Sequence, residues 1–332
     1  MSTYYNDKLG QLKDIFGAGH VEAQEDHVTI DGKVFPVIDD VIILLDETAM
    51  PPLVRRRLSK QNAPSEDPGF SEDVQFSFGA EWTKYPDILP EHRDEFNQYF
   101  DLVDIDSLAG ARSMDLGCGI GRWSYFLKDI CGEMILVDFS EAIFVARKNL
   151  RGSVNCVFFM ADITKLPFRS DAADFILCLG VLHHLPMDAL KATRYLKGFA
   201  PRALIYLYYA LDNRPVYFRA LLAAATMVRL AASRIRNERL RSIFTWLVAA
   251  LVYKPFIVIG QALGPLGLSS SVPLYEGYRG KSLGRIQQDV YDRFFTTIEQ
   301  RVSRSQIMAL RDSYSKITVS ENIPYWHFLL ER

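Results

Sequence analysis

Length, composition and charge set the first limits on what this chain can be. It has 332 residues, of which 49% are hydrophobic, and a net charge of −2 at pH 7. A chain of this length buries a full hydrophobic core and forms one large domain with additions or two smaller domains. Because nucleic-acid-binding proteins carry an excess of basic residues, the near-neutral charge predicts a small-molecule partner and no nucleic acid.

The cysteines and the N-terminal residues favour a cytoplasmic location. The chain has four cysteines, Cys118, Cys131, Cys156 and Cys178, and their wide spacing is typical neither of a metal-binding pair nor of a dense disulfide framework. The first residues, MSTYYNDKLGQLKDIFG, contain no basic region followed by a continuous apolar segment. We therefore expect no signal peptide.

Residues 1–74 predict a small N-terminal appendage. The stretch HVTIDGKVFPVIDDVIILLDE has the composition of two or three short strands around an Asp-Gly turn. A polar linker, NAPSEDPG, follows it.

Residues 75–211 predict the core domain. Helix-length amphipathic segments alternate there with apolar runs of strand length, namely ARSMDL, EMILVDF, VNCVFFMAD, DFILCLG and ALIYLYYAL. Such alternation is typical of a parallel sheet that is buried on both faces and connected by crossover helices. We predict an α/β fold with a doubly wound, Rossmann-like, mostly parallel seven-stranded sheet, to which residues 286–332 add a helix and a closing strand pair.

Three alternating glycines follow the first core strand, in ARSMDLGCGIGRWSYFL. In a doubly wound sheet, the first strand-to-helix turn carries such glycines and binds the ligand. Gly117 permits a tight turn, while Gly119 and Gly121 let backbone amides approach a ligand near the positive end of the next helix. A dinucleotide-binding turn has Gly or Ala where this chain has Arg122, which argues against a nicotinamide oxidoreductase.

With Asp115 before the turn, MDLGCGIGRWS resembles the cofactor motif of the class I S-adenosylmethionine-dependent methyltransferases of the small-molecule type. The resemblance covers residues 75–211 and, more loosely, the final strands. It implies that S-adenosylmethionine is the cofactor. The residues that it implies as cofactor contacts are Asp115, Gly117, Cys118, Gly119, Gly121, Asp138, Phe139, Ser140, Asp162, Ile163, Leu179 and Gly180.

The resemblance also implies separate roles for these residues. Asp138 ends the second core strand, where an acidic side chain accepts both ribose hydroxyls, and Phe139 offers a stacking surface. Asp162 meets the adenine amino group, with Ile163 beside the ring. Leu179 and Gly180 supply backbone near the methionine part of the cofactor.

The pair His183 and His184, just after the fourth core strand, is the candidate catalytic group. Displacement at a sulfonium methyl mainly requires alignment and exclusion of water, so a base is needed only where the acceptor must lose a proton. Imidazole titrates near neutrality and suits that task. A structural or helix-capping role for the pair stays open.

Two aromatic residues and one N-terminal stretch carry weaker hypotheses. Phe78 and Trp82, in QFSFGAEWTKY, either form a lid over the cofactor or pack against the sheet. DGKVFPVIDDVIILLDE loosely resembles a zinc-ribbon appendage of some methyltransferases. Since no cysteine precedes Cys118, we expect no metal.

Residues 212–285 predict a helical insertion that caps the acceptor side of the site. The apolar runs IFTWLVAALVY and FIVIGQALGPLGL are separated by Lys254 and Pro255, and each is shorter than the roughly 18 residues of a simple membrane span. A dimer surface or a peripheral contact with lipid is the alternative. The insertion is also locally basic, with Arg214, Arg219, Arg229, Arg234, Arg236, Arg239 and Arg241, which either meet an anionic acceptor or are solvated.

These features together predict O-, N- or C-methylation of a bulky, partly hydrophobic or anionic metabolite, or of a lipid- or sugar-linked intermediate. The alternative is a catalytically inactive, methyltransferase-like binding subunit. The intact glycine turn, Asp138 and Asp162 favour the enzyme.

Overall fold

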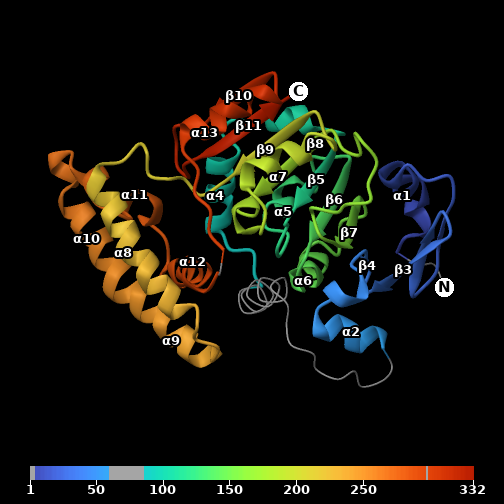
Figure 1. Ribbon diagram of the computed structural model, residues 1–332, viewed down its shortest axis with the longest axis horizontal. Coiled ribbons are helices and arrows are strands. Elements are labelled where there is room, and N and C mark those ends of the chain that lie inside the picture. The colour runs from blue at the N-terminus through green and yellow to red at the C-terminus, as the bar shows by residue number, and fades with distance from the viewer. Residues whose placement is uncertain (1–3, 60–85, 297) are drawn as a thin grey trace.

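The computed structural model describes residues 4–59, 86–296 and 298–332 (Figure 1). These residues form one sheet of eleven strands in the order β1-β2-β3-β4-β7-β6-β5-β8-β9-β11-β10. The strands are β1 Val21–Ala23, β2 His27–Ile30, β3 Lys33–Ile38, β4 Val41–Ile43, β5 Arg112–Leu116, β6 Glu133–Asp138, β7 Cys156–Met160, β8 Phe175–Leu179, β9 Arg202–Tyr206, β10 Lys316–Val319 and β11 His327–Glu331.

The part of the sheet from β7 to β10 confirms the predicted doubly wound fold. Strands β7, β6, β5, β8 and β9 are parallel to their neighbours, while β11 is antiparallel to β9 and β10. The chain winds from β5 outward in both directions, through β6 and β7 on one side and β8 and β9 on the other. The switch in strand order therefore lies at β5 and β8, where sheets of this kind bind ligands.

The seven strands predicted for the core are β7, β6, β5, β8, β9, β11 and β10, and the N-terminal strands extend the same sheet to eleven. Strand β4 pairs in parallel with β7, with Ile42 opposite Phe159. Asp31 and Gly32 connect β2 to β3, both with positive φ, as a two-residue hairpin turn of type I′ requires. The N-terminal segment is thus continuous with the core sheet.

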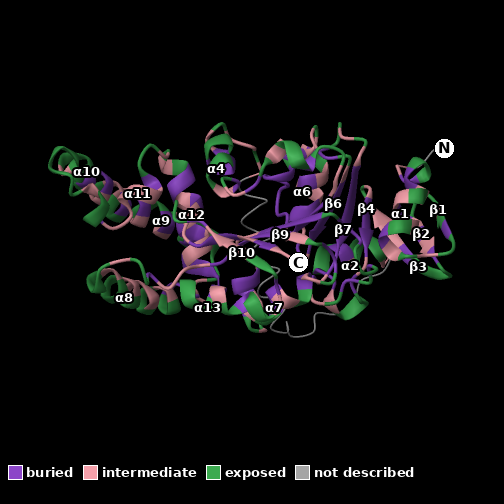
Figure 2. Ribbon diagram, turned by 90° about the horizontal axis from the view of Figure 1, so that it is seen from above, coloured by how far each residue is buried: buried purple, intermediate pink, exposed green. Residues whose placement is uncertain are grey.

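Helices cover both faces of the sheet, and side chains of successive strand residues enter opposite layers. Ile135 and Val137 of β6 pack in one hydrophobic cluster, and Met134 and Leu136 pack in the other. Helices α1 (Leu9–Phe16), α7 (Ala189–Leu196) and α13 (Arg304–Met308) contribute to the first cluster, and α2 (Pro52–Leu58), α4 (Glu91–Tyr99), α5 (Ser124–Leu127) and α6 (Ala142–Asn149) contribute to the second. Figure 2 shows the central strands buried between these helices.

The segment after β9 is helical and lies at the end of the molecule opposite β1–β3 (Figure 1). Its helices are α8 (Val216–Ala232), α9 (Glu238–Val248), a π-helical turn (Ala249–Tyr253), α10 (Lys254–Ala262), α11 (Tyr275–Tyr278) and α12 (Leu283–Phe295). Ile286, Val290 and Phe294 of α12 join the separate hydrophobic cluster of this segment. The expected boundary at residue 285 therefore cuts through α12, and the helical segment extends to residue 295.

Helices α9 and α10 join through the π-helical turn into one helix, Glu238–Ala262, of 25 residues. Among the described residues, this is the helix that is long and apolar enough to cross a membrane by length and composition, with mean hydropathy 1.9 and 28% of its apolar window buried. The two apolar runs on either side of Lys254 and Pro255, each too short for a span by itself, thus belong largely to one helix. Pro255 lies in the first turn of α10, where a missing backbone donor is tolerated, directly after the π-helical turn.

Candidate active site

A cavity of about 750 Å³ lies between the carboxyl ends of the core strands and the helical segment. Residues that follow β5, β6, β7 and β8 meet at one side of it, as the switch in strand order requires. The expected cofactor residues that line it are Gly117, Cys118, Gly119, Asp138, Phe139, Ser140, Asp162, Ile163, Leu179 and Gly180.

The glycine turn is held by close contacts that exclude larger residues. Gly117 has φ of 75°, and a Cβ atom there would lie 2.3 Å from Cγ2 of Val181, which follows β8. The amide of Gly119 donates a hydrogen bond to Oδ2 of Asp138 at 2.8 Å. The turn after β5 is therefore fixed both by the segment after β8 and by the end of β6.

Asp115 and Gly121 are absent from the cavity lining, unlike the other expected cofactor residues, and their contact with the cofactor stays a prediction. Asp115 is buried and accepts a hydrogen bond from Oγ of Ser124 at 2.6 Å. A Cβ atom on Gly121 would lie 2.8 Å from Leu150 and 3.3 Å from Ala146 of α6. Both residues support the turn from behind. Burial, opposed by the Ser124 hydrogen bond, raises the pKa of Asp115 to about 7.

Asp138 is both a support for the glycine turn and part of the cavity wall. Its Oδ1 accepts from the amide and hydroxyl of Ser140, at 2.8 and 2.7 Å, and its Oδ2 accepts from Gly119. Burial raises the pKa of Asp138. Since a carboxylate offers about four lone-pair positions, about one is left for a ribose hydroxyl. A second hydroxyl requires the Ser140 side chain to rotate away.

Asp162 is oriented by a tight turn after β7. Its Oδ1 accepts from the amide and hydroxyl of Thr164, at 2.9 and 2.7 Å. Oδ2 is not used in these two bonds, and Asp162, Ile163 and Thr164 line the cavity together. With Phe139 and Leu179, Ile163 gives this part of the cavity apolar walls that suit an aromatic ring.

The two histidines have different positions. His184 lines the cavity, and its Nδ1 donates to the carbonyl of Ile298 at 2.7 Å. Because a carbonyl only accepts, neutral His184 carries its proton on Nδ1, and Nε2 is an acceptor. His183 is absent from the lining, is fully buried and stacks on Tyr208 with 3.9 Å between ring centroids. Burial holds the pKa of His183 well below its usual range, so His183 is not suited to be the base.

The proposed lid residues Phe78 and Trp82 lie outside the described residues.

The other half of the cavity is built from residues that the sequence analysis missed. Its apolar wall consists of Phe218, Leu221, Leu222, Ala225 and Val228 of α8, with Val248, Val252 and Phe256. Its tyrosines are Tyr99, Tyr206, Tyr208, Tyr209, Tyr253, Tyr278 and Tyr325. The run IYLYYA at the end of β9, which contains Tyr206, Tyr208 and Tyr209, is the local sequence feature that could have identified three of these tyrosines.

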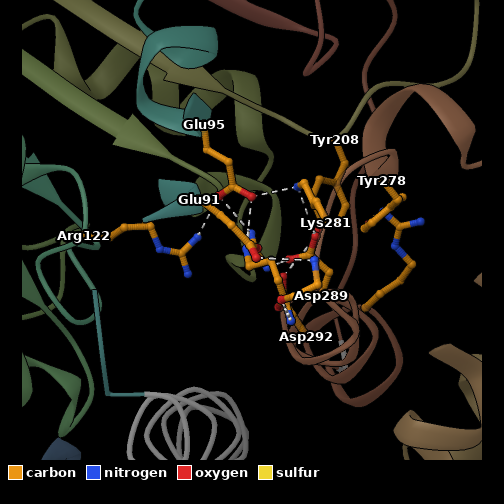
Figure 3. Close-up of polar contacts among 11 residues, drawn as sticks. Glu91, Glu95, Arg122, Tyr208, Tyr278, Lys281, Asp289 and Asp292 are labelled. Carbon is orange, nitrogen blue, oxygen red and sulfur yellow. Dashed lines mark hydrogen bonds and ion pairs between the residues drawn. The ribbon is translucent and has the colours of Figure 1, made fainter. Parts of the chain in front are cut away.

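A buried ionic cluster joins α4, the glycine turn and α12 beside the cavity (Figure 3). Glu95 of α4 accepts from Lys281 at 2.7 Å and from Nε of Arg285 at 3.0 Å, and lies 3.6 Å from Arg122. Arg285 also pairs with Asp289. Burial opposes ionisation of Glu95, but these cations hold its pKa well below the usual range. The cluster connects the core domain to the helical segment.

Of the two alternatives left open for the basic residues of the insertion, solvation describes four of the seven arginines. Arg214 lines it but is paired with Glu276, and Arg229 donates to the carbonyl of Thr296 at 2.8 Å. Arg241 is paired with Glu238. The exposed members of the set are Arg219, Arg234, Arg236 and Arg239.

Neither a metal centre nor a disulfide bond is found in the part of the chain that the structure describes. No group of three or more His, Cys, Asp or Glu side chains is arranged there to hold a metal ion. The four cysteines are free thiols, and all are buried.

Comparison with known proteins identifies the central part of the chain. Residues 114–197 match the model of a methyltransferase-domain family. Phosphoethanolamine N-methyltransferase 3 of Arabidopsis thaliana is 29% identical over 106 residues, which are 31% of this chain and 21% of that protein. The chain thus spans about a fifth of the length of this curated relative.

Two solved methyltransferases give weaker similarities. An N-methyltransferase from Bradyrhizobium japonicum, solved with S-adenosylhomocysteine, is 20% identical over 40% of this chain and 72% of its own, with a TM-score of 0.35. Magnesium protoporphyrin IX methyltransferase from Synechocystis is 13% identical over 81% of this chain and 89% of its own, with a TM-score of 0.39. The matched segment 114–197 contains the glycine turn, Asp138 and Asp162, so this part of the chain is a methyltransferase domain.

Proposed function

We propose that the protein transfers a methyl group from S-adenosylmethionine to a small-molecule acceptor held in this cavity. The observation that carries the proposal is that one cavity runs from the residues of the methyltransferase motifs to the apolar wall of α8. Cofactor and acceptor can therefore lie in contact, away from bulk water. When bound, S-adenosylmethionine supplies a methyl group on a sulfonium, which an aligned nucleophile displaces.

The residues present fit this cofactor. The carboxylate of Asp138 and the adjacent Ser140 suit ribose hydroxyls, and Asp162 suits the adenine amino group. Cations are attracted to aromatic faces, and the rings of Trp123 and Tyr206 line the same cavity, where they suit the positive sulfonium.

His184 is the candidate base at this cavity. It holds its proton on Nδ1 through the carbonyl of Ile298, which leaves Nε2 to take a proton from an acceptor oxygen or nitrogen. Nε2 is itself buried, so the imidazole must shift to reach an acceptor. His183 packs behind it and supports its position. An acceptor that carries no proton to lose needs only the alignment that the cavity walls provide.

The walls favour a bulky, partly hydrophobic acceptor. The curated relative is named for phosphoethanolamine, a small polar molecule, whereas the acceptor half of this cavity has the apolar side chains of Phe218, Leu221 and Leu222 on one side. An apolar portion of the acceptor gains free energy by covering that wall. A lipid-linked acceptor fits this arrangement better than a free sugar.

Methyl-labelled S-adenosylmethionine tests the proposal directly. The purified chain is incubated with it and with a lipid and metabolite extract of cells that express the protein, and labelled products are identified by mass spectrometry. We expect one amphiphilic labelled product. Binding of the cofactor by calorimetry without any labelled product would instead support the alternative, a methyltransferase-like subunit that binds but does not catalyse.

We also propose that the helical segment makes a peripheral contact with an anionic membrane. Most of the exposed large hydrophobic side chains of the described residues lie between residues 216 and 268, including Ile243, Trp246, Leu247 and Leu251. Exposed arginines of α8, of the α8–α9 connection and of α9 accompany them. Apolar side chains beside exposed cations are typical of an interfacial helix on anionic lipid. Leu221, Val228 and Val252 are exposed and also line the cavity, which supports entry of a lipid-linked acceptor from that face.

A further inference from the structure

Arg293 of α12 differs from every other cation that lines the cavity. Arg122, Arg214, Lys281, Arg285 and Arg301 each form an ion pair with a carboxylate. Arg293 forms no such pair with any residue that the structure describes. Its Nη2 donates to the hydroxyl of Tyr278 at 3.4 Å, and its Nε is buried without a hydrogen-bond partner.

The acid next to Arg293 in the sequence is already engaged. Asp292 accepts from the hydroxyl of Tyr208 at 3.0 Å and from Thr296 at 3.3 Å. The groups whose pKa Arg293 lowers are instead tyrosines, namely Tyr206, Tyr208, Tyr209, Tyr253 and Tyr278. Burial outweighs this effect and raises the pKa of each, so all five keep their hydroxyl protons and can donate.

Arg293 is half-buried, with its Nε fully withdrawn from solvent. A guanidinium in such a place is normally paired, because removing an unpaired charge from water is costly. The cavity that Arg293 lines is open to a ligand. We propose that Arg293 binds an anionic group of the acceptor, a carboxylate or a phosphate, with the hydroxyl of Tyr278 donating beside it. The inference rests on the proposed function only in naming this ligand as the methyl acceptor.

The position of Arg293 also defines the shape of the acceptor. The apolar wall of α8, with Phe218 and Leu222, lines the same cavity. An acceptor held at Arg293 therefore has an anionic group and an apolar body that covers this wall. The guanidinium can bind two oxygens of either anion side by side, which a lysine cannot reproduce.

Calorimetry with octanoate, octyl phosphate and neutral octanol as probes tests the site in the full chain. We expect at least one of the two anions to bind at least tenfold more tightly than octanol, and the comparison between them separates the carboxylate from the phosphate. In Arg293→Gln this preference should disappear. Arg219→Gln, an exposed arginine of α8 outside the cavity lining, is the matched control and should keep it.

The same measurements separate this inference from the proposed function. S-adenosylmethionine is titrated into each variant, and its affinity should be unchanged in Arg293→Gln. Failure of the wild-type chain to bind the cofactor would reject the methyltransferase proposal. Equal binding of octanol and both anions by the wild type would reject the anion site, as would a retained preference in Arg293→Gln. Arg293→Lys, which keeps the charge, should retain part of the preference, and its thermal midpoint shows whether the fold is intact.

Discussion

Two arginines on one helix have opposite expected effects on stability. Arg293 is half-buried and forms no ion pair with a carboxylate among the described residues, and Glu299, whose charge acts on it, is itself paired with Arg301. Arg285, two turns earlier, pairs with Glu95 and Asp289. Substitution by methionine removes the cost of holding an unpaired charge away from water at Arg293, whereas at Arg285 it removes a buried ion pair.

We therefore expect Arg293→Met to raise the free energy of unfolding by about 2 kcal/mol, and Arg285→Met to lower it by about 3 to 5 kcal/mol. Urea denaturation without ligand measures both changes. A destabilised Arg293→Met would mean that Arg293 holds the fold together and is not reserved for a ligand.

Asp115 gives the folded protein a defined dependence on pH. Its pKa is raised to about 7, mainly by burial, whereas an aspartate in an unfolded chain titrates near 3.9. Between these values the folded protein keeps the proton and the unfolded chain releases it. The free energy of unfolding therefore falls as pH rises from about 4 to about 7, by at most about 4 kcal/mol.

Asp115→Asn should remove most of this slope, since asparagine does not titrate and can still accept from Ser124. Urea denaturation of both proteins at pH 5 and pH 8 gives the comparison. A slope that is the same in wild type and variant would place the titrating group elsewhere. Asp138, whose pKa is also raised by burial, contributes in the same direction and accounts for what remains.

The two histidines should separate catalysis from structure. His184→Gln is expected to lower the initial rate of methyl transfer by about a hundredfold for an acceptor that must lose a proton, with unchanged cofactor affinity. His183→Gln should mainly lower stability, because His183 is buried against Tyr208 and lies away from the cavity lining. Equal rates in wild type and His184→Gln would leave both histidines with a structural role only.

At the scale of elements, one carboxylate of the core domain pairs with two cations at the start of α12. Glu95 of α4 contacts Arg285 of α12, Lys281 just before α12 and Arg122 after the glycine turn. Figure 3 shows Arg122 and Lys281 approaching this carboxylate from opposite sides. Replacing Glu95 leaves Lys281 and Arg285 with Asp289 as the remaining acid that they contact.

Glu95→Gln should therefore lower the free energy of unfolding by about 3 to 5 kcal/mol and loosen the helical segment. Limited proteolysis read by mass spectrometry should give faster cleavage within residues 212–295 than elsewhere. Glu331→Gln is the control, since it removes only the exposed pair with Lys316, which contributes little. Unchanged cleavage in Glu95→Gln would show that the hydrophobic cluster alone holds the segment.

The elements also show which features a sequence can predict. The glycine turn, Asp138 and Asp162 belong to local strand-to-helix patterns, so spacing alone placed them on one side of a cavity. Lys254 and Pro255 separate two apolar runs in the sequence, but both runs lie on one helix, in which Tyr253 and Ile257 are buried in the cluster with α12. This tertiary packing favours one continuous helix where local propensity favours an interruption.

The distinction between features set by local sequence and features set by tertiary packing also holds for single residues of the site. Arg293 could not be selected from the sequence, because nothing local distinguishes it from Arg285 on the same helix. Its lack of a carboxylate partner in the described residues follows only from how α12 packs against α4 and the end of β9. Expectations that depend on tertiary contacts, such as the roles of His183 and Asp115, changed for the same reason.

At the scale of the whole molecule, exposed apolar surface is concentrated at one end. Figure 2 shows long exposed stretches on α8 and α10, while the strands at the centre are buried. Ile243, Leu247 and Leu251 are exposed by 56%, 41% and 68%. They follow one another at spacings of four residues along the helix that joins α9 to the π-helical turn, so they share one face. A face of this kind requires a partner surface to be removed from water.

The last prediction concerns the nature of that partner. We expect the protein to sediment with vesicles of phosphatidylglycerol and phosphatidylcholine more strongly than with phosphatidylcholine alone, and to bind less at high salt because the exposed arginines contribute. The double variant Ile243→Glu with Leu247→Glu should weaken vesicle binding at least tenfold, since each substitution places a negative charge in the face that contacts the lipid. Val154→Glu, at a position that is 84% exposed and outside the helical segment, should bind as the wild type does. The alternative is that this face binds a second copy of the chain, and sedimentation velocity without lipid tests it. A wild-type homodimer that the double variant dissociates, combined with no binding of the wild type to vesicles, would assign the face to a second copy.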